Sequence, residues 1–209
     1  MVAKFSEQEF EKLKKLTLLY EWAHKIMMTK LSIIHESHKH FESINPISSI
    51  TGRLKTPASI AGKLHNDNLE LTAENARKHL KDISGIRIIC PYAKDIFFMA
   101  DVIRAMPEIK ILNEKDFVTN PKPSGYRSYH MIIEVDVYHS GRTETLPVEI
   151  QIRTEAMNFW STLEHQAKYK YQNDIPKHLS DELVLCAEKI SELDQRMYLI
   201  YEIISMINE

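Results

Sequence analysis

Cysteine is scarce in this chain of 209 residues, which contains only two. Cys90 and Cys186 lie far apart, and neither belongs to a CxxC pair. The sequence therefore predicts neither a disulfide scaffold nor a zinc ribbon. We expect both residues to be reduced, buried thiols in a cytoplasmic protein.

Long apolar runs and an excess of one charge are also missing. No apolar stretch approaches the ~18 residues that a membrane-spanning helix needs, and residues 1–10 lack the apolar core of a signal peptide. We therefore expect a protein that is neither exported nor membrane-inserted. The 27 Lys and Arg nearly balance the 29 Asp and Glu, which argues against coating nucleic acid or an anionic membrane through the overall field. Any anion site must come from a local cluster.

The composition, with 44% hydrophobic and 27% charged residues, is that of an ordinary globular protein. Hydrophobic periodicity indicates that helices and strands alternate along the chain. Helices are predicted over residues 6–43, 57–65, 72–80, 93–106, 154–171 and 180–207. Strands are predicted over residues 86–90, 109–112, 126–138 and 143–153, with residues 51–53 in a loop. The expected class is α/β or α+β, with a mixed sheet flanked by helices and long helices at both termini.

Polar and apolar residues alternate along the strand predicted at 143–153. Its apolar members include Val148, Ile150 and Ile152, and its polar members include Glu149, Gln151 and Arg153. Successive side chains of a strand point to opposite faces, so the three polar groups should share one surface. A carboxylate such as Glu149 on a largely buried strand needs a cation or a metal as partner.

Cationic and hydroxyl side chains gather around the start of the helix predicted at 57–65. They are Arg53, Lys55, Ser59 and Lys63. A helix N-terminus offers unpaired N–H groups and partial positive charge, so added cations favour a polyphosphate site. The alternative is a basic surface loop without a ligand.

Asp82 comes just before the strand predicted at 86–90, with Gly85 between them. A carboxylate at that place can present a metal ligand at the edge of a sheet, although it is more commonly a turn residue. Arg87 projects from the same strand, opposite to its apolar neighbours, where it can pair with an acid or lie flat on a purine.

Residues 122–130 combine cations, a histidine and aromatic rings around a glycine-containing loop. Tyr126, Ser128 and His130 alternate, so a ring suited to stacking and an imidazole should share one strand face. A histidine-rich stretch, His35, His38 and His40, lacks the HExxH spacing of zinc proteases, and we expect it to be a solvated helix face.

Four motifs in this order resemble the small alarmone synthetases, the stand-alone synthetase members of the RelA/SpoT family. They are Thr51-Gly52-Arg53-Leu54-Lys55 with Ser59 and Lys63, Asp82-Ile83-Ser84-Gly85-Ile86-Arg87, Ser124-Gly125-Tyr126-Arg127-Ser128-Tyr129-His130, and Val148-Glu149-Ile150-Gln151-Ile152-Arg153-Thr154 with Asn158-Phe159-Trp160 and Glu164-His165. The segment Pro121-Lys122-Pro123 resembles the RelP-type branch more than the RelQ-type. The resemblance implies a synthetase domain over 45–175, preceded by a helical region (1–44) and followed by a C-terminal helix (176–209).

The resemblance also implies an activity: transfer of pyrophosphate from ATP to the 3′-hydroxyl of GDP or GTP, on a nucleotidyltransferase-like sheet. Asp82 and Glu149 would be catalytic and would bind Mg²⁺, with Glu149 taking the proton of the hydroxyl. The residues implied for ATP are Arg53, Lys55, Ser59, Lys63 and Arg87, with Arg87 stacked on adenine. Those implied for GDP or GTP are Lys122, Ser124, Tyr126, Arg127, His130, Gln151 and Asn158, with Tyr126 stacked on guanine and Glu164 as a possible supporting residue.

Two departures from the family pattern refine this expectation. The helix after Lys63 often carries arginines in relatives, but residues 64–68 contain none here, so we expect either weaker ATP binding or His65 or Lys78 in their place. No His-Asp dipeptide occurs anywhere, whereas long family members build a hydrolase domain around one. We therefore expect synthesis without degradation, and a chain too short for ribosome-sensing domains.

The partners expected are the two nucleotides and further copies of the chain. In small alarmone synthetases, apolar stripes like those of the terminal helices resemble the elements that build a homotetramer. No membrane or nucleic acid is expected as partner. Two other functions fit the same sequence: a nucleotidyltransferase that adds a nucleotide and releases pyrophosphate, and a nucleotide- or RNA-binding oligomer without turnover. Two acids beside polyphosphate speak against the second.

Overall fold

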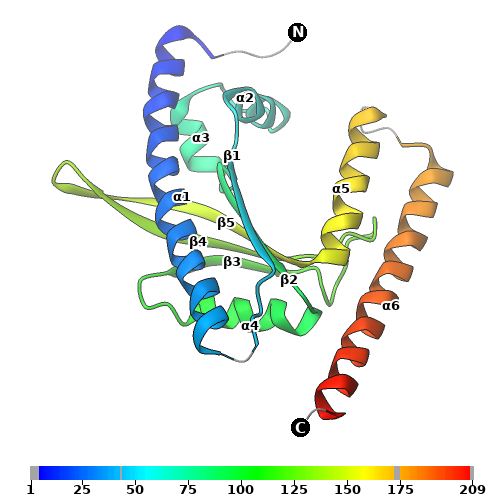
Figure 1. Cartoon of the computed structure of the whole chain (residues 1–209). Helices are drawn as coiled ribbons and strands as arrows, with labels where there is room; N and C mark the ends of the chain where they lie inside the picture. The colour runs from blue at the N-terminus through cyan, green and yellow to red at the C-terminus, as the bar shows by residue number, and fades with distance from the viewer. Residues whose placement is uncertain (1–4, 43, 172–174, 208–209) are drawn as a thin grey trace.

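A five-stranded mixed sheet forms the centre of the molecule in the computed structural model, which describes residues 5–42, 44–171 and 175–207 (Figure 1). The helices are α1 (Glu7–Phe41), α2 (Pro57–Asn66), α3 (Ala73–His79), α4 (Ala93–Arg104), α5 (Glu155–Lys170) and α6 (Lys177–Ile207). The strands are β1 (Ser49–Leu54), β2 (Ser84–Cys90), β3 (Lys110–Asp116), β4 (Tyr129–His139) and β5 (Arg142–Thr154). The predicted class, a mixed sheet with helices on it and long terminal helices, is confirmed.

The strand order is β1-β2-β5-β4-β3. β2 and β5 are parallel, and the other neighbouring pairs are antiparallel. The parallel pair sets Gly85 opposite Glu149 and Arg87 opposite Gln151. Across β4 and β5, His130 is opposite Gln151. Polar residues from three adjacent strands therefore meet on one face of the sheet.

The other face of the sheet is apolar and carries the core. Ile88, Met131, Ile133, Ile150 and Ile152 are almost fully buried there, in one cluster with residues of α1 and α4. Burial of these branched side chains is the main favourable term for the fold. Because α1 and α4 cover the apolar face, the polar face stays open to ligands.

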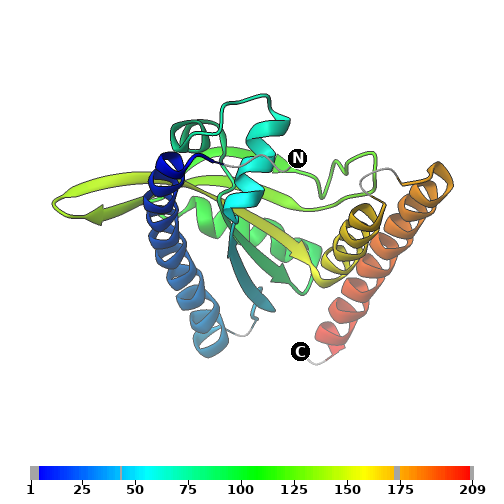
Figure 2. The ribbon, with the colours of Figure 1, turned by 90° about the horizontal axis from the view of Figure 1, so that it is seen from above.

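The helices begin where the sequence supplies caps. The side chain of Ser6 accepts a hydrogen bond from the backbone N–H of Glu9 at the start of α1, and that of Thr56 accepts one from the N–H of Ser59 at the start of α2. At the other end of the chain, α5 and α6 lie side by side beyond the sheet (Figures 1 and 2). Within the described residues, no helix combines the length and the apolar character needed to cross a bilayer.

Residues 51–53 were expected in a loop, and this prediction is wrong: they belong to β1. The strand can form because Gly52 lies under the ring of His24 from α1. A Cβ atom at Gly52 would lie 2.3 Å from the Cε1 atom of that ring. The glycine that suggested a turn is required for this close approach of helix and strand.

Other expectations are corrected in detail. Cys186 is exposed on α6, whereas Cys90 is buried as expected, and both are free thiols. The strand predicted from residue 126 begins only at Tyr129, since residues 120–128 form the preceding loop, while β3 extends beyond its predicted end to Asp116.

Candidate functional site

Three adjoining cavities lie over the polar face of the sheet. The central cavity, of about 230 Å³, is lined by Thr51, Gly52, Arg53, Lys55, Asp82, Gly85, Ile86, Arg87, Glu149 and Gln151. The β3-side cavity, of about 390 Å³, is lined by Lys63, His79, Lys81, Asp82, Asn113, Lys115, His130, Ile132 and Glu149. The α5-side cavity, of about 500 Å³, is lined by Arg53, Arg87, Lys122, Ser124, Tyr126, Gln151, Arg153, Ser161, Thr162, Glu164, His165, Gln166 and Lys168.

Asp82 and Glu149 line both the central and the β3-side cavity, so these two acids face one space although 67 positions separate them. The loop before β2 positions Asp82, and β5 positions Glu149. The arrangement suits a shared cation.

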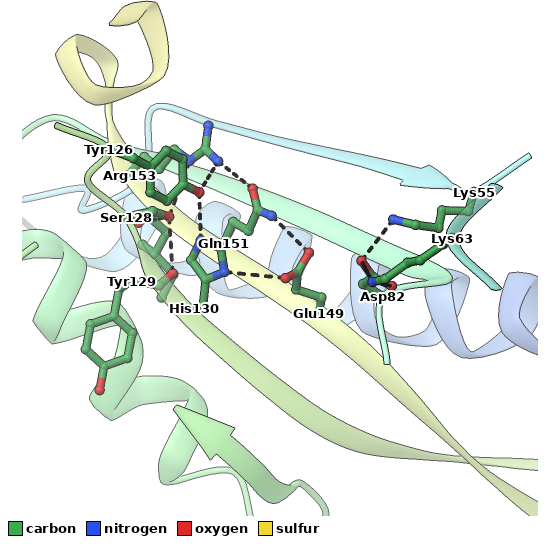
Figure 3. Close-up of polar contacts among 11 residues, drawn as sticks. Lys55, Lys63, Asp82, Tyr126, Ser128, Tyr129, His130, Glu149, Gln151 and Arg153 are labelled. Atoms are coloured by element: carbon green, nitrogen blue, oxygen red, sulfur yellow. Dashed lines mark hydrogen bonds and ion pairs between the residues drawn. The ribbon is translucent and has the colours of Figure 1, made fainter. Parts of the chain in front are cut away.

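Two lysines hold Asp82 (Figure 3). Lys63 of α2 donates to both carboxylate oxygens at 2.8 Å, and Lys55 donates to Oδ2 at 2.9 Å. Burial raises the pKa of Asp82, but the hydrogen bonds and charges of Lys63 and Lys55 outweigh this effect and leave the pKa below its usual value. Asp82 is therefore ionised at neutral pH.

Glu149 has one partner on each of its carboxylate oxygens. His130 Nδ1 lies 3.4 Å from Oε1, and the amide of Gln151 donates to Oε2 at 2.9 Å. Burial raises the pKa of Glu149, whereas His130 and Gln151 lower it, and the net pKa is below the usual value. Glu149 is accordingly a carboxylate at neutral pH, the form that can accept a proton.

Tyr126 and His130 are brought together, although Tyr126 lies in the loop before β4 and not on the strand that the alternation predicted. The Tyr126 hydroxyl and His130 Nε2 are 2.7 Å apart, and the two rings meet edge to face. The ammonium of Lys122 lies 5.0 Å from the centre of the Tyr126 ring. Lys122, Ser124 and Tyr126 all line the α5-side cavity, which places an aromatic ring beside a cation there.

Arg87 lies between the central and the α5-side cavity and reaches α5. Its Nη1 donates to the amide oxygen of Asn158 at 3.2 Å, while its Nε has no hydrogen-bond partner within the described part of the chain. Burial and the charges of Arg153 and Arg53 lower the pKa of Arg87. An anion placed over this guanidinium would offset that repulsion, and the flat guanidinium also suits stacking on a purine ring.

Glu164 is buried on α5 and forms an ion pair with Lys168. Both residues line the α5-side cavity. Glu164 is therefore paired with a lysine that lies one turn further along the same helix.

Two of the predicted site residues lie apart from these contacts. Arg127 turns away from Tyr126 and donates to the carbonyl oxygen of Val118 at 2.7 Å, in a small space lined by α5 and α6. Ser59 is exposed on the first turn of α2, where its hydroxyl accepts a hydrogen bond from Thr56 at 3.0 Å. His65 and Lys78, expected as substitutes for arginines, are also exposed.

The sequence analysis missed several residues that line the cavities. His79, Lys81 and Lys115 add basic groups to the β3-side cavity. Arg153 is only 3% exposed and binds several groups of the site, although its position on the polar side of β5 had been predicted. The available signal was the place of Arg153 on the same strand face as Glu149 and Gln151.

The donor set of Asp82 and Glu149 fits Mg²⁺ rather than zinc. Mg²⁺ is commonly held by one or two carboxylates together with waters and substrate phosphates. No cluster of three or more His, Cys, Asp or Glu that could hold a metal occurs within residues 5–42, 44–171 and 175–207. His35 and His38 instead contact Asn45 and Phe98.

Comparison with known proteins places this geometry in a family. Residues 52–174 match the region found in RelA and SpoT proteins, which is more than half of the chain. The chain is also 41% identical over 184 residues to the GTP pyrophosphokinase YwaC of Bacillus subtilis, covering 88% of each protein. This chain belongs to the RelA/SpoT family. The matched region contains every residue that lines the three cavities except Thr51.

Solved structures of this family share the whole fold. The small alarmone synthetase 1 of Bacillus subtilis bound to its product pppGpp superposes with a TM-score of 0.88, at 31% identity, covering 93% of this chain and 99% of the other. The same synthetase bound to AMPCPP superposes with a TM-score of 0.81, at 30% identity, covering 94% and 99%. The likeness includes the terminal helices, which lie outside the matched family region.

Proposed function

We propose that the protein is a small alarmone synthetase that transfers pyrophosphate from ATP to the 3′-hydroxyl of GDP or GTP and releases AMP. The observation that carries the proposal is the convergence of Asp82 and Glu149 on one cavity, with lysines on one side and Tyr126 on the other. Related proteins with the same fold are a GTP pyrophosphokinase and a synthetase with bound pppGpp.

The donor ATP fits the side of the sheet formed by β1, β2 and α2. Arg53, Lys55 and Lys63 supply positive charge there, with Ser59 at the start of α2. Arg87 stacks on adenine with its guanidinium plane. Because Lys55 and Lys63 hold Asp82 in this structure, ATP phosphates compete with Asp82 for both lysines.

The acceptor nucleotide fits the α5-side cavity. Tyr126 stacks on guanine and Gln151 lines the base pocket, which Asn158 joins through its hydrogen bond with Arg87. Lys122 binds phosphates together with His130, which contacts Tyr126 and lines the adjoining β3-side cavity. Ser124 belongs to the same loop. Arg127 supports the loop through Val118, so its predicted contact with acceptor phosphates requires the loop to rearrange.

The chemistry follows from the charges. The 3′-oxygen attacks the β-phosphorus of ATP, the bond from that phosphorus to the α–β bridging oxygen breaks, and AMP leaves with the electron pair. Glu149 takes the hydroxyl proton, since the low pKa keeps it ionised. Mg²⁺ held by Asp82 and Glu149 would neutralise charge on the phosphoryl oxygens. The cationic residues of the cavities add to this stabilisation, and positioning of the hydroxyl supplies much of the rest.

Synthesis of alarmone without its degradation is part of the proposal for this chain, and the lack of a His-Asp dipeptide in its sequence supports it. Its RelP-type character rests on Pro121-Lys122-Pro123, and its cytoplasmic location on its nucleotide substrates and free thiols.

A homotetramer is part of this proposal. Large apolar side chains stay at least half exposed along α6 at three- and four-residue spacing, among them Leu193, Met197, Ile200 and Ile203. Burial against other copies would remove this apolar area from water. Light scattering at micromolar concentration should give about four times the chain mass of 24.4 kDa, whereas a monomer would refute the tetramer.

One product assay tests the reaction. The purified protein is incubated with Mg²⁺, ATP and GDP, and the nucleotides are separated by ion exchange. AMP and a guanosine tetraphosphate should appear in equal amounts. Release of pyrophosphate would instead identify a nucleotide-adding transferase, and binding without any product would identify a non-catalytic nucleotide-binding protein.

Replacement of Glu149 tests its assigned role as the general base. Glu149→Gln should lower AMP release by about 10²-fold or more, within the range expected for a general base, without unfolding the protein. Glu134→Gln is the matched control, because Glu134 lies on the neighbouring strand β4 and pairs with Lys110. Near-normal AMP release by Glu149→Gln would reject the role.

A further inference from the structure

A closed ring of polar contacts joins the proposed base to the proposed guanine-stacking residue (Figure 3). One arm runs from Glu149 through His130 to the Tyr126 hydroxyl, with separations of 3.4 and 2.7 Å. The other arm runs from Glu149 to Gln151 at 2.9 Å. Both arms end on Nη2 of Arg153, which donates to the Tyr126 hydroxyl at 2.6 Å and to the Gln151 amide oxygen at 2.7 Å.

Arg153 is built into the protein rather than exposed to a ligand. Its remaining nitrogens are also used: Nε donates to Ser128 at 3.3 Å, and Nη1 donates to Ser161 at 2.9 Å. The residue is 3% exposed, and no acid lies within ion-pair distance of it in the described part of the chain. A buried guanidinium held only by neutral groups is costly, so a compensating role is expected.

We propose that Arg153 is a positioning residue for the synthetase reaction, which sets the direction of every hydrogen bond in this ring and so presents a donor to each oxygen of Glu149. The inference rests on the proposed function, in which Glu149 is the base and Tyr126 binds guanine.

The direction of each hydrogen bond in the ring follows from which groups can donate and which can accept. Arginine has donors only, so both the Tyr126 hydroxyl oxygen and the Gln151 amide oxygen must accept from Arg153. The tyrosine proton is then free for Nε2 of His130, which leaves the imidazole proton on Nδ1, facing Glu149. On the other arm the amide oxygen of Gln151 is occupied, so its NH₂ group faces Glu149.

The ring therefore links recognition of the guanine of the acceptor nucleotide to the orientation of Glu149, the proposed general base. The carboxylate of Glu149 is fixed by two arms that both depend on Arg153, and one of them passes through Tyr126. Such fixed orientation affects the chemical step more than substrate binding, because a misplacement of the reacting groups raises the barrier without removing a contact to ATP.

The test uses Arg153→Lys and Tyr126→Phe in the full chain. Lysine keeps the charge but loses the planar fork that reaches several acceptors at once. Phenylalanine keeps the ring and removes only the hydroxyl. Arg104→Lys and Tyr129→Phe are matched controls, because Arg104 donates to the Tyr129 hydroxyl at 2.9 Å and Tyr129 lies against α4 on the apolar face.

The expected result is a split between kcat and KM. Arg153→Lys should lower kcat about 10- to 100-fold, the scale of a misplaced reacting group, with KM for ATP unchanged. Tyr126→Phe should lower kcat about 3- to 10-fold, the scale of one lost hydrogen bond. The double variant should lose less than the product of the two effects, because both changes break one arm. Both control variants should keep the wild-type kcat.

Nitrogen-15 NMR of the histidines, without substrates, gives a readout independent of turnover. His130 should carry its proton on Nδ1 in the wild type, and its Nε2 signal should shift in Tyr126→Phe, because that nitrogen loses its hydrogen-bond donor. A proton on Nε2 in the wild type, an unchanged kcat in Arg153→Lys or fully multiplicative losses would overturn the inference. If the wild type makes no AMP, the proposed function fails, and the tautomer still decides the direction of the ring. Should Arg153→Lys fail to fold, Tyr126→Phe alone decides the outcome.

Discussion

The ammonium group of Lys63 lies 2.8 Å from both carboxylate oxygens of Asp82. This contact joins α2, which carries cations that we propose for a polyphosphate, to the loop that carries the proposed metal ligand. Lys55 adds a second donor to the same carboxylate. The two lysines therefore neutralise Asp82 in this structure, and in the proposed reaction a metal and a triphosphate would replace these contacts.

Asp82→Asn should separate phosphate binding from catalysis. Loss of a metal ligand should lower AMP release by about 100-fold or more, since Lewis-acid stabilisation amounts to several kcal/mol. In EDTA, however, the variant should bind ATP more tightly than the wild type, because Lys55 and Lys63 lose a competing carboxylate. Isothermal titration with and without the chelator measures this difference.

A matched control for this prediction is Asp101→Asn. Asp101 is an exposed acid that pairs with Arg104 on α4, away from the cavities. The control should leave both turnover and ATP affinity unchanged. Weaker ATP binding by Asp82→Asn in EDTA would mean that the two lysines do not contact the phosphates.

Tyr126→Ala should weaken the binding of the acceptor nucleotide without weakening that of ATP. Loss of base stacking should reduce GDP affinity by about 1–3 kcal/mol, the range found for stacked bases in nucleic-acid complexes. ATP affinity should change little, because Tyr126 lines the α5-side cavity and not the central one. Titration of each nucleotide checks both parts, with Tyr138→Ala on the exposed hairpin as control. Equal losses for ATP and GDP would contradict the assignment.

Alternation along β5 made the polar row of the site predictable from the sequence. Glu149, Gln151 and Arg153 alternate with residues that are completely or almost completely buried, and a strand offers no other way to place them. The convergence of Asp82 on this row depends on the parallel pairing of β2 with β5. The strands can be predicted from the sequence but their order cannot, so the convergence of Asp82 with Glu149 was implied only by the resemblance to the family.

Tertiary contacts explain why some local features differ from the expectation. Thr51-Gly52-Arg53 has the composition of a turn, but it pairs with β2 as a strand, and Gly52 leaves room for the ring of His24. Arg127 was assigned to the acceptor through the resemblance to the family. The loop before β4 instead directs Arg127 to Val118, and no local pattern predicts that contact.

Gly125 lies against α6, in the loop of residues 120–128 that we propose to bind the acceptor nucleotide. Its replacement should disturb both the loop and α6. Gly125 has a φ of +87°, and a Cβ atom there would lie 2.5 Å from the Cβ of Ala187. Gly125→Ala should therefore destabilise the protein and raise KM for GDP more than KM for ATP. The backbone strain alone costs about 1–2 kcal/mol. Thermal unfolding and steady-state kinetics measure the two effects.

A second substitution, at Ala187, distinguishes the cost of the positive φ in Gly125→Ala from the cost of the steric overlap with Ala187. Ala187→Gly removes the atom that a Cβ at Gly125 would meet, so the double variant should regain part of the lost stability. Gly62→Ala serves as control, because that helical glycine has open space around it and alanine should stabilise α2 by about 0.5–1 kcal/mol. Wild-type stability in Gly125→Ala would show that the loop does not rest on α6.

Asp194 attaches α6 to the end of β5, and its charge works against folding. The hydroxyl of Thr154 donates to its carboxylate at 2.7 Å. Burial raises the pKa of Asp194, and this hydrogen bond lowers it only in part. A raised pKa in the folded state means that the folded protein binds this proton more tightly than the unfolded chain does. The ionised carboxylate therefore reduces stability at neutral pH.

Asp194→Asn should make the protein more stable at neutral pH, because the amide oxygen can still accept from Thr154 without carrying charge. The gain should be absent below the unfolded pKa of about 3.9, grow as pH rises through the raised folded pKa, and then stay constant. Thermal unfolding of the variant and the wild type at a series of pH values measures the difference. Asp181→Asn, at an exposed position of the same helix, should show no such rise. A variant less stable than the wild type at pH 7 would mean that the ionised Asp194 stabilises the junction of α6 with β5.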